Sequence, residues 1–556
     1  MKQLYLSKRV NKLTSKRTCY SSLVYSFTRQ LVYLFTRQLV YLFIATLSCF
    51  SCVDYLDIRP ESQLLQEEFW QNESDVEAML MACYRTMQED DFMWRVITWG
   101  ELRSDNMVAG GGNVSDDERQ MDNANILPTN GLAQWTAFYR LINYCNTILK
   151  YAPQVMETDP NFTNADLQAK SAEALALRAL SYFYLVRTFR DVPLMLDATV
   201  DDTQVLQIPQ STPDRVLAKI TDDLLQAEEW AMLGFTFESE DKGRMTKDVI
   251  RAILADVYLW RKDYAKSVEY CDKLINAKSV SDRITGMNVE LPKYSLIEDY
   301  DLLYEIFYPG NSTESIFELQ FTTEKNNEAV AKLYGNTTTN VGRLIATTVY
   351  AEGVECFGKT DTRKADFICM SKTDDGVYGI FKYLGIHQAL GINHLYVYDS
   401  STATWIFYRI TDVMLMKAEA LVQLNRSDDD LREALRIVNT TYMRANPTLL
   451  ETDTLAFDTY GNVNNMEKLV LRERQRELMF EGKRWFDLLR HAERKNSTED
   501  LVNHVVLKYT VNQSTIASKL SVMNALYMPI HADELKVNAL LIQNPYYQSS
   551  TNIEKQ

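Results

Sequence analysis

The chain has 556 residues, 46% of them hydrophobic and 24% charged, with a formal net charge of −16 at pH 7. Eight of its 59 basic residues and none of its 75 acidic residues lie in residues 1–51, so the remainder carries a formal charge of −24. This length is ample for a large core. The acidic balance disfavours nucleic-acid partners, because attraction to phosphate needs clustered positive charge.

The first 51 residues form a basic, apolar leader. A mostly apolar run from Leu39 to Leu47 is followed by small residues and by Cys49 and Cys52. A charged start, a short apolar run and a small-residue cleavage site are the parts of a secretory signal. The run is too short to cross a bilayer, which needs roughly 20 apolar residues.

The cysteine at the end of the leader indicates a lipoprotein. A thiol at a new N-terminus can carry acyl chains, and each buried methylene contributes roughly 0.8 kcal/mol to membrane binding. Ser51 precedes Cys52 and the polar chain begins just after it, so we expect residues 1–51 to be a signal peptide and Cys52 to be lipidated. Two alternatives stay open: lipidation at Cys49, and a soluble secreted protein.

The remaining cysteines indicate neither a disulfide framework nor a zinc site, because their number is odd and they are widely spaced. They are Cys83, Cys145, Cys271, Cys356 and Cys369.

The first half of the body reads as helices separated by polar stretches. Apolar residues recur at helical spacing over residues 74–88, with Ser74 as the expected N-cap, whereas residues 100–130 have the composition of a long loop. Pro193 ends one of the helical patterns, since proline cannot continue a helix. The other expected helices here span residues 134–151, 167–189 and 212–233.

The second half combines helical hairpins with a different central region. Residues 247–261 and 264–276 predict a hairpin of tetratricopeptide type, and residues 406–424 and 429–444 predict a second one. A densely charged pattern predicts one long helix over 466–493. Between the hairpins, residues 279–403 are turn-rich, with one strand expected within 314–321.

We therefore expect a mainly α fold. Tetratricopeptide-like hairpins would form a scaffold over about 52–278 and 404–556, interrupted by a loop-rich insertion with short strands over about 279–403.

Several segments, taken in order, resemble the SusD/RagB family of outer-membrane nutrient-binding lipoproteins. The matching segments begin at Cys52, Arg178, Asp191, Glu314, Tyr408, Arg474, Tyr527 and Gln543 and read CVDYLD, RALSYFYLV, DVPL, ESIFELQF, YRITDVMLMKAEA, RQRELMFEGKRWFDLLR, YMPIH and QNPY. Two positions depart from the family pattern. Arg190 stands where members often have glycine, and His531 replaces a proline.

The resemblance implies a cell-surface lipoprotein that captures a glycan or other nutrient and passes it to a TonB-dependent, SusC-like transporter in the outer membrane. It implies no cofactor. A helical scaffold that binds protein segments is the alternative, since helical hairpins bind such segments in their grooves. An enzyme is the third possibility.

Catalytic patterns are weak. Glu473, Glu477 and Glu481 share one helix face, whereas glycoside hydrolysis needs two carboxylates that flank the substrate. With basic neighbours on the same segment, these glutamates are expected to form ion pairs. None of the five histidines pairs at the spacing of a zinc enzyme, so we expect no metal and no catalytic residues.

Ligand binding without catalysis needs aromatic faces and nearby hydrogen-bonding groups. Two patches at irregular segments fit that need, and the first is Trp94, Trp99, Asp105 and Asn106. The second is Tyr396, Tyr398 and Trp405. The alternative is that Trp99 packs under the loop while Asp105 and Asn106 cap or turn it.

Overall fold

The computed structural model describes residues 69–548 with short gaps, so the leader and Cys52 lie outside the described residues. The gaps are residues 111, 200–206, 282–288, 298–303, 308–309, 336–340, 354–355, 371–375, 384–386, 389–394 and 397–399. Within the described part, no helix combines the length and the apolar character needed to span a membrane.

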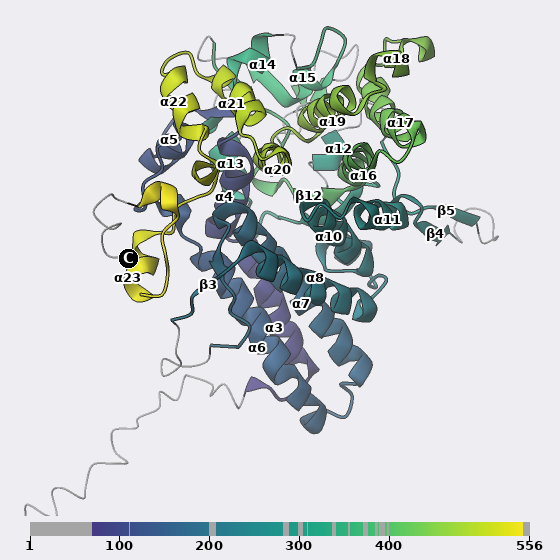
Figure 1. Ribbon diagram of the computed structural model, residues 1–556. Helices are drawn as coiled ribbons and strands as arrows, with labels where there is room; N and C mark the ends of the chain where they lie inside the picture. Colours follow the sequence, from purple (N-terminus) through teal and green to yellow (C-terminus); the bar gives the residue numbers. More distant parts are fainter. Residues whose placement is uncertain are drawn as a thin grey trace, which may run out of the picture. The chain divides into compact units, whose positions relative to one another are not determined.

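Four long helices pack side by side in the first half (Figure 1). They are α3 (Glu73–Met87), α6 (Thr136–Thr158), α7 (Asn164–Phe189) and α8 (Pro213–Trp230). All four were predicted. The N-cap of α3 is Asn72 rather than Ser74, because the Asn72 side chain accepts a hydrogen bond from the Ser74 N–H and forms a capping box with Asp75. Every residue of α7 from Ser171 to Phe189 is buried, which makes α7 the central helix of this group.

The segment predicted as a loop over 100–130 contains regular structure. Helix α4 (Asp90–Ile97) continues into a π-helical turn, η1 (Thr98–Leu102), which is followed by β1 (Met107–Ala109) and α5 (Asp116–Asp122). Ser115 and Glu118 form a capping box at the start of α5, a pattern that the loop prediction overlooked. A short 3₁₀ turn, η2 (Gly131–Ala133), leads into α6.

Both predicted hairpins are present. Helices α10 (Lys247–Trp260) and α11 (Tyr264–Ile275) pair through a three-residue turn, and α16 (Ile410–Leu424) pairs with α17 (Asp428–Ala445). The second hairpin shares an apolar core with α19 (Val463–Leu478). The start of the predicted helix 406–424 was wrong, because Trp405–Arg409 forms strand β12, which pairs with β6 (Ser315–Leu319). Strand β6 lies within the predicted strand region. The fold is thus mainly helical, as expected.

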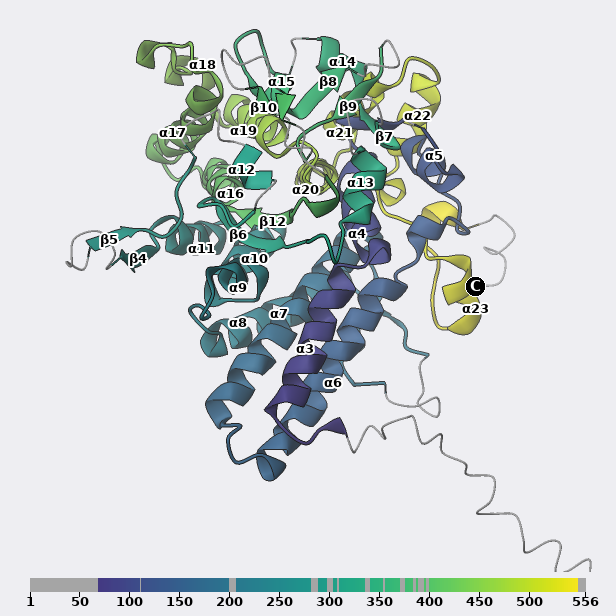
Figure 2. The ribbon, with the colours of Figure 1, turned by 180° about the vertical axis from the view of Figure 1, so that it is seen from behind.

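The loop-rich region contains short elements only. The sheets in the described residues have two strands each: β1 pairs with β7, β2 with β3, β4 with β5, β6 with β12, β8 with β9 and β10 with β11. In both ribbon views, α14 and α15 lie at the top of the body, at the end opposite to the lower ends of α3 and α6, and Figure 2 shows β8 beside them (Figures 1 and 2). The remaining strands are β2 (Val192–Pro193), β3 (Gln210–Ser211), β4 (Lys278–Ser281), β5 (Val289–Pro292), β7 (Leu344–Ala346), β8 (Ile368–Met370), β9 (Tyr378–Ile380), β10 (His387–Gln388) and β11 (Leu395–Tyr396). The short helices are α9 (Glu238–Gly243), α12 (Tyr304–Phe307), α13 (Glu328–Tyr334), α14 (Thr348–Glu352), α15 (Arg363–Phe367) and α18 (Phe457–Tyr460).

The predicted long helix 466–493 is two helices. Helix α19 ends at Leu478 and α20 (Arg484–Lys495) begins after a break in which Phe480 and Gly482 adopt φ values of +68° and +70°. Glu101, from the π-helical turn, accepts hydrogen bonds from the N–H groups of Phe480 and Lys483 at 3.0 and 3.1 Å. A distant carboxylate thus satisfies N–H groups in the break and at the start of α20. The chain closes with α21 (Glu499–Val505), α22 (Gln513–Leu520) and α23 (Ala532–Val537).

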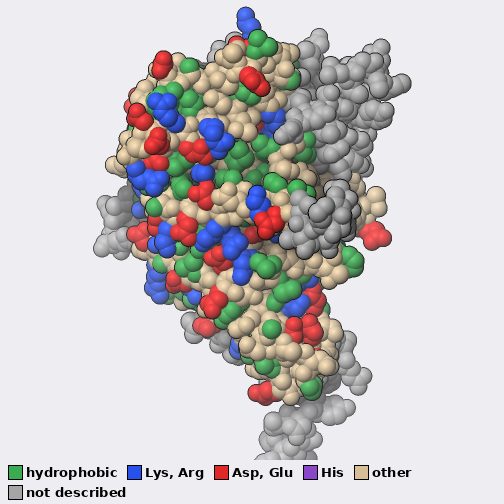
Figure 3. All heavy atoms as spheres, turned by 90° about the vertical axis from the view of Figure 1, so that its right-hand side faces the viewer, with side chains coloured by type: hydrophobic (Ala, Val, Ile, Leu, Met, Phe, Trp, Pro, Cys, Tyr) green, Lys and Arg blue, Asp and Glu red, His purple; other side chains and the backbone are tan. Residues whose placement is uncertain are grey.

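Charges on the surface are mixed. On the face shown in Figure 3, Lys and Arg side chains lie interspersed with Asp and Glu side chains. Exposed pairs such as Arg436–Glu433 on α17, 2.7 Å apart, are typically worth about 0.2–1 kcal/mol. Surface pairs of this kind therefore contribute little to the stability of the fold.

The backbone at Gly100, in η1, lies very close to the backbone at Gly482, in the break between α19 and α20. Adding one methyl group at Gly100 is therefore expected to have a severe effect. A Cβ atom on Gly100 would lie 1.8 Å from the carbonyl oxygen of Gly482. We expect Gly100→Ala to lower the free energy of unfolding by at least ~1–3 kcal/mol, because backbone must move to admit the methyl group. Urea unfolding measures this. The matched control is Gly112→Ala, whose new methyl group would meet no atom within 4 Å. Equal unfolding midpoints for the two variants would contradict this packing.

Candidate functional site

The helix-to-loop junction that was predicted to bind ligand is largely buried. The Trp99 ring is 1% exposed, stacks on Phe138 with centroids 4.8 Å apart and meets Phe189 edge-on. Its Nε1 donates a hydrogen bond to the Leu132 carbonyl at 2.8 Å. The ring therefore offers no face to a sugar, and the prediction that Trp99 contacts ligand is wrong. The alternative stated with it, packing under the loop, is confirmed.

Asp105 and Asn106 are also internal. The Asp105 carboxylate forms a two-point ion pair with Arg484 at 2.8 and 2.9 Å and accepts a hydrogen bond from the Tyr350 hydroxyl at 2.6 Å. Burial opposes ionisation of Asp105, but the Arg484 guanidinium outweighs it and holds the pKa of Asp105 well below its usual value. Asn106 donates to Glu101 at 2.7 Å. Gln475 of α19 donates to the carboxylate of Asp105 at 3.0 Å and to the side-chain oxygen of Asn106 at 2.9 Å. Both side chains are thus used inside the protein, so the prediction that they bind ligand is wrong.

Trp94 remains partly exposed. Its Nε1 donates to Oε1 of Glu118 at 3.2 Å, and the guanidinium of Arg343 lies 4.9 Å from the centre of its ring. Arg343 also pairs with Glu118 at 3.2 Å. Three segments distant in the sequence thus hold this indole at the surface: α4, α5 and the residues just before β7. Glu118 is 1% exposed, so the groups open to a ligand are the Trp94 indole and the Arg343 guanidinium, which can contact the apolar face and the hydroxyl groups of a sugar.

Two residues that contact Trp94, Glu118 and Arg343, were missed by the sequence analysis. Glu118 could have been found, because Ser115 and Glu118 have the spacing of a capping box. Arg343 gives no local signal. It reaches Trp94 because β7 pairs with β1, joining Leu344–Ala346 to Met107–Ala109.

The second predicted patch is only partly described. Trp405 is 1% exposed and stacks on Tyr383 with centroids 5.3 Å apart, so the prediction that it binds ligand is wrong. Tyr396 belongs to β11, where it stands opposite His387. Tyr398 lies outside the described residues.

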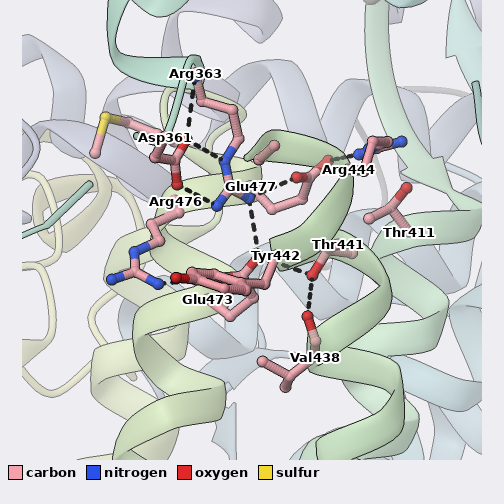
Figure 4. A network of polar contacts seen from close by, with 12 residues as sticks. Asp361, Arg363, Thr411, Val438, Thr441, Tyr442, Arg444, Glu473, Arg476 and Glu477 are labelled. Carbon is pink, nitrogen blue, oxygen red and sulfur yellow. Dashed lines mark hydrogen bonds and ion pairs between the residues drawn. The ribbon is translucent and has the colours of Figure 1, made fainter. Parts of the chain in front are cut away.

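The glutamates of the charged segment form a buried ion network, and Figure 4 shows the part of it around Glu473 and Glu477. Arg363 donates to both Glu473 and Glu477, at 2.9 and 2.8 Å. Arg409 is shared between Glu477 and Glu481, at 2.9 Å from each. The prediction of ion pairs is therefore confirmed, although most of the cationic partners come from outside the segment: Arg363, Lys382, Arg409 and Arg444.

The carboxylates of these three glutamates have a structural role. Burial opposes the ionisation of Glu477, but the cations around it, Arg444 first, hold its pKa well below the usual value. All three glutamates are at most 3% exposed, so a substrate cannot reach them in this structure. Within the described ranges, no group of three or more His, Cys, Asp or Glu side chains is placed to hold a metal ion.

Comparison with known proteins gives consistent matches. Residues 361–547 match the family model described as "SusD family", and residues 54–259 match the one described as "Starch-binding associating with outer membrane". The chain is 26% identical over 483 residues to "SusD-like protein P38" of Formosa agariphila, an alignment that covers 79% of this chain and 88% of the relative.

Solved structures share the fold. A SusD homologue from Bacteroides thetaiotaomicron aligns with a TM-score of 0.69 at 20% identity, covering 86% of this chain and 98% of that one. A structure titled "Laminarin binding SusD-like protein" aligns with a TM-score of 0.64 at 22% identity, covering 85% and 99%.

The low pKa values lead to a prediction about acid stability. For Asp105, Glu419 and Glu477 the folded pKa lies below the unfolded one, so the stability they provide is present above about pH 4.5 and is lost as the pH falls further. We expect Asp105→Asn to cost about 3–5 kcal/mol at pH 7, because it leaves Arg484 buried without its partner. The variant should also lose less stability than the unmodified protein between pH 5 and 3.

Denaturant unfolding across this pH range measures both effects. The control is Asp458→Asn, at an exposed carboxylate on α18. If Asp105→Asn and the control were equally stable at pH 7, the ion pair would not have the structural role assigned to it.

Proposed function

The chain belongs to the SusD/RagB family, and on that premise we propose that it is a glycan-binding lipoprotein of the outer membrane that delivers its ligand to a SusC-like, TonB-dependent transporter. The observation that carries the proposal is the match of both halves of the body to this family, one of them to a family model described as starch-binding. The laminarin-binding relative with the same fold supports a glycan rather than another nutrient.

The proposed ligand surface is the Trp94 surface, defined as Trp94 and Arg343, with the buried Glu118 carboxylate holding both side chains in place. Trp94 is the one residue of the first predicted patch that is not buried, since Trp99, Asp105 and Asn106 lie in the interior. Arg343 brings the loop-rich region to the indole, so ligand contacts would combine the helical scaffold with that region. Tyr396 and Tyr398, in the same region of the sequence, stay proposed contacts.

The membrane anchor and the transporter rest on the leader and on the family. Acylation of Cys52 would hold an acidic, water-soluble body at the membrane. The family-model description "associating with outer membrane" supports that location. Binding without catalysis agrees with the structural use of Glu473, Glu477 and Glu481.

Ligand binding is tested with a panel of neutral polysaccharides that includes laminarin and starch, and with peptides as a second arm. We expect binding to at least one polysaccharide, and we expect Trp94→Ala to weaken it at least tenfold, equivalent to about 1.4 kcal/mol. Calorimetry measures the affinity. The matched control is Trp230→Ala, at another partly exposed indole, on α8. Affinity unchanged by Trp94→Ala would remove this surface, and binding to no member of the panel would favour the helical scaffold instead.

Acylation is tested in cells with an alkyne-labelled fatty acid. Cys52→Ala should abolish labelling and release the protein from the outer-membrane fraction, whereas Cys49→Ala should leave both unchanged. The reverse pattern would assign the anchor to Cys49. An unlabelled, soluble protein in all cases would refute the lipoprotein proposal. Co-purification of a large transporter from solubilised outer membranes tests the partner.

A further inference from the structure

A hollow of about 620 Å³ lies among the ends of α7, α10 and α20 and the start of α8. An adjacent hollow of about 310 Å³ shares Arg190 and Asp191 with it. Both volumes fall in the range of small-molecule sites, roughly 300–1,000 Å³. None of the residues used for the Trp94 surface lines either one.

Two residues at this larger hollow have unusual backbone conformations. Arg190 has φ +71° and ψ −74°, in a tight turn closed by the Asp191 N–H and the Phe189 carbonyl at 3.0 Å. Lys262, in the turn between α10 and α11, has φ +64°. Among the described residues other than Gly and Asn, positive φ occurs at four positions: Ala124, Arg190, Lys262 and Phe480. Both basic members of this set line the same hollow.

The positive φ values of Arg190 and Lys262 raise the free energy of the folded state. A side chain at positive φ costs roughly 1–3 kcal/mol, and glycine would avoid it. Lys262 adopts its positive φ in the turn that ends α10, where the Asp263 N–H donates to the Tyr258 carbonyl at 2.9 Å and where glycine or asparagine is the usual residue. The presence of a cation at both positions, beside one hollow, motivates a role for the two side chains.

The cations at the rim are weakly neutralised. Arg190, whose side chain is 48% exposed, comes no nearer than 3.9 Å to its partner Asp191. Arg261 donates to the Thr221 hydroxyl at 2.7 Å and Lys262 to the Glu493 carbonyl at 3.0 Å, and neither has an ion pair within the described part of the chain. Arg490, deeper in the same lining, is fully paired with Glu419 and Asp487.

The lining also suits a sugar ring. Trp260 is partly exposed and is held edge-on against Phe183, with centroids 6.2 Å apart. An indole presents an apolar face to the C–H groups of a pyranose. Asp191 and Asp214 line the same hollow and can accept hydrogen bonds from hydroxyl groups.

We propose that this hollow is a second binding site, for an acidic saccharide. A carboxylate or sulfate on the sugar would lie between Arg190 and Lys262, with Arg261 nearby, and the ring would lie against Trp260. Charge-assisted hydrogen bonds from guanidinium and ammonium groups to such an anion are among the stronger ones in proteins. The proposal rests on the proposed glycan-binding function and adds a site and a ligand class to it.

The experiment measures the affinity of the full chain for three probes by calorimetry: tetragalacturonate, a chondroitin sulfate oligosaccharide and maltotetraose. The first two distinguish carboxylate from sulfate, and the third carries no charge. Arg190→Gly and Lys262→Asn remove a cation and relieve the backbone at the same time. We expect each variant to bind the acidic probes at least tenfold more weakly, with an unfolding midpoint equal to or above that of the unmodified protein. The control is Arg436→Gln, which removes an exposed cation from α17.

The outcomes separate this site from the Trp94 surface. Absence of binding to both acidic probes, affinities unchanged in Arg190→Gly and Lys262→Asn, or an equal loss in Arg436→Gln would overturn the proposal. If Trp94→Ala rather than Arg190→Gly abolished acidic binding, the proposed function would stand and the second site would fail. If the Arg190 and Lys262 variants lost acidic binding while Trp94→Ala changed no affinity, the second site would stand without the Trp94 surface.

Discussion

The structure depends on a set of buried carboxylates, each of which needs a cationic partner. Glu473 and Glu477 on α19, and Glu481 just after it, are removed from water, and an unpaired buried charge costs several kcal/mol. Their partners include Arg363 and Lys382, which belong to the loop-rich region. The buried glutamates of the helical scaffold therefore have all their cationic partners only when the loop-rich region packs against the scaffold. The network gains little net stability over an apolar core, but it allows few alternative arrangements.

The break after α19 extends the same constraint to the N-terminal part of the body. Glu101 accepts hydrogen bonds from backbone N–H groups in the break, and Asp105 pairs with Arg484 at the start of α20. The π-helical turn is thereby fixed, and α4, which leads into it, presents Trp94 at the surface. Strand β1, a few residues later, brings in β7 and Arg343. Interior contacts therefore position the side chains of the candidate ligand surface.

Much of the scaffold could be predicted from the sequence, since its helices have apolar residues at helical spacing. The pattern failed where a distant contact decided the local structure. The charged run 466–493 reads as one helix, yet the close approach of Gly100 to Gly482 and the carboxylate of Glu101 require a break. Trp99 and Trp405 flank irregular segments, which suggested exposure, but partners remote in the sequence cover them. Arg343 was unpredictable for the same reason.

The way the loop-rich region is fastened has an evolutionary consequence. Its described residues are held by charged side chains such as Arg363 and Lys382, by aromatic contacts such as Tyr383 against Trp405, and by two-stranded sheets rather than by a long continuous sheet. Insertions and deletions between those anchors leave the helical pairs undisturbed, because no extended strand register has to be preserved. A lineage can therefore diversify what it captures by exchanging these stretches while inheriting an unchanged frame.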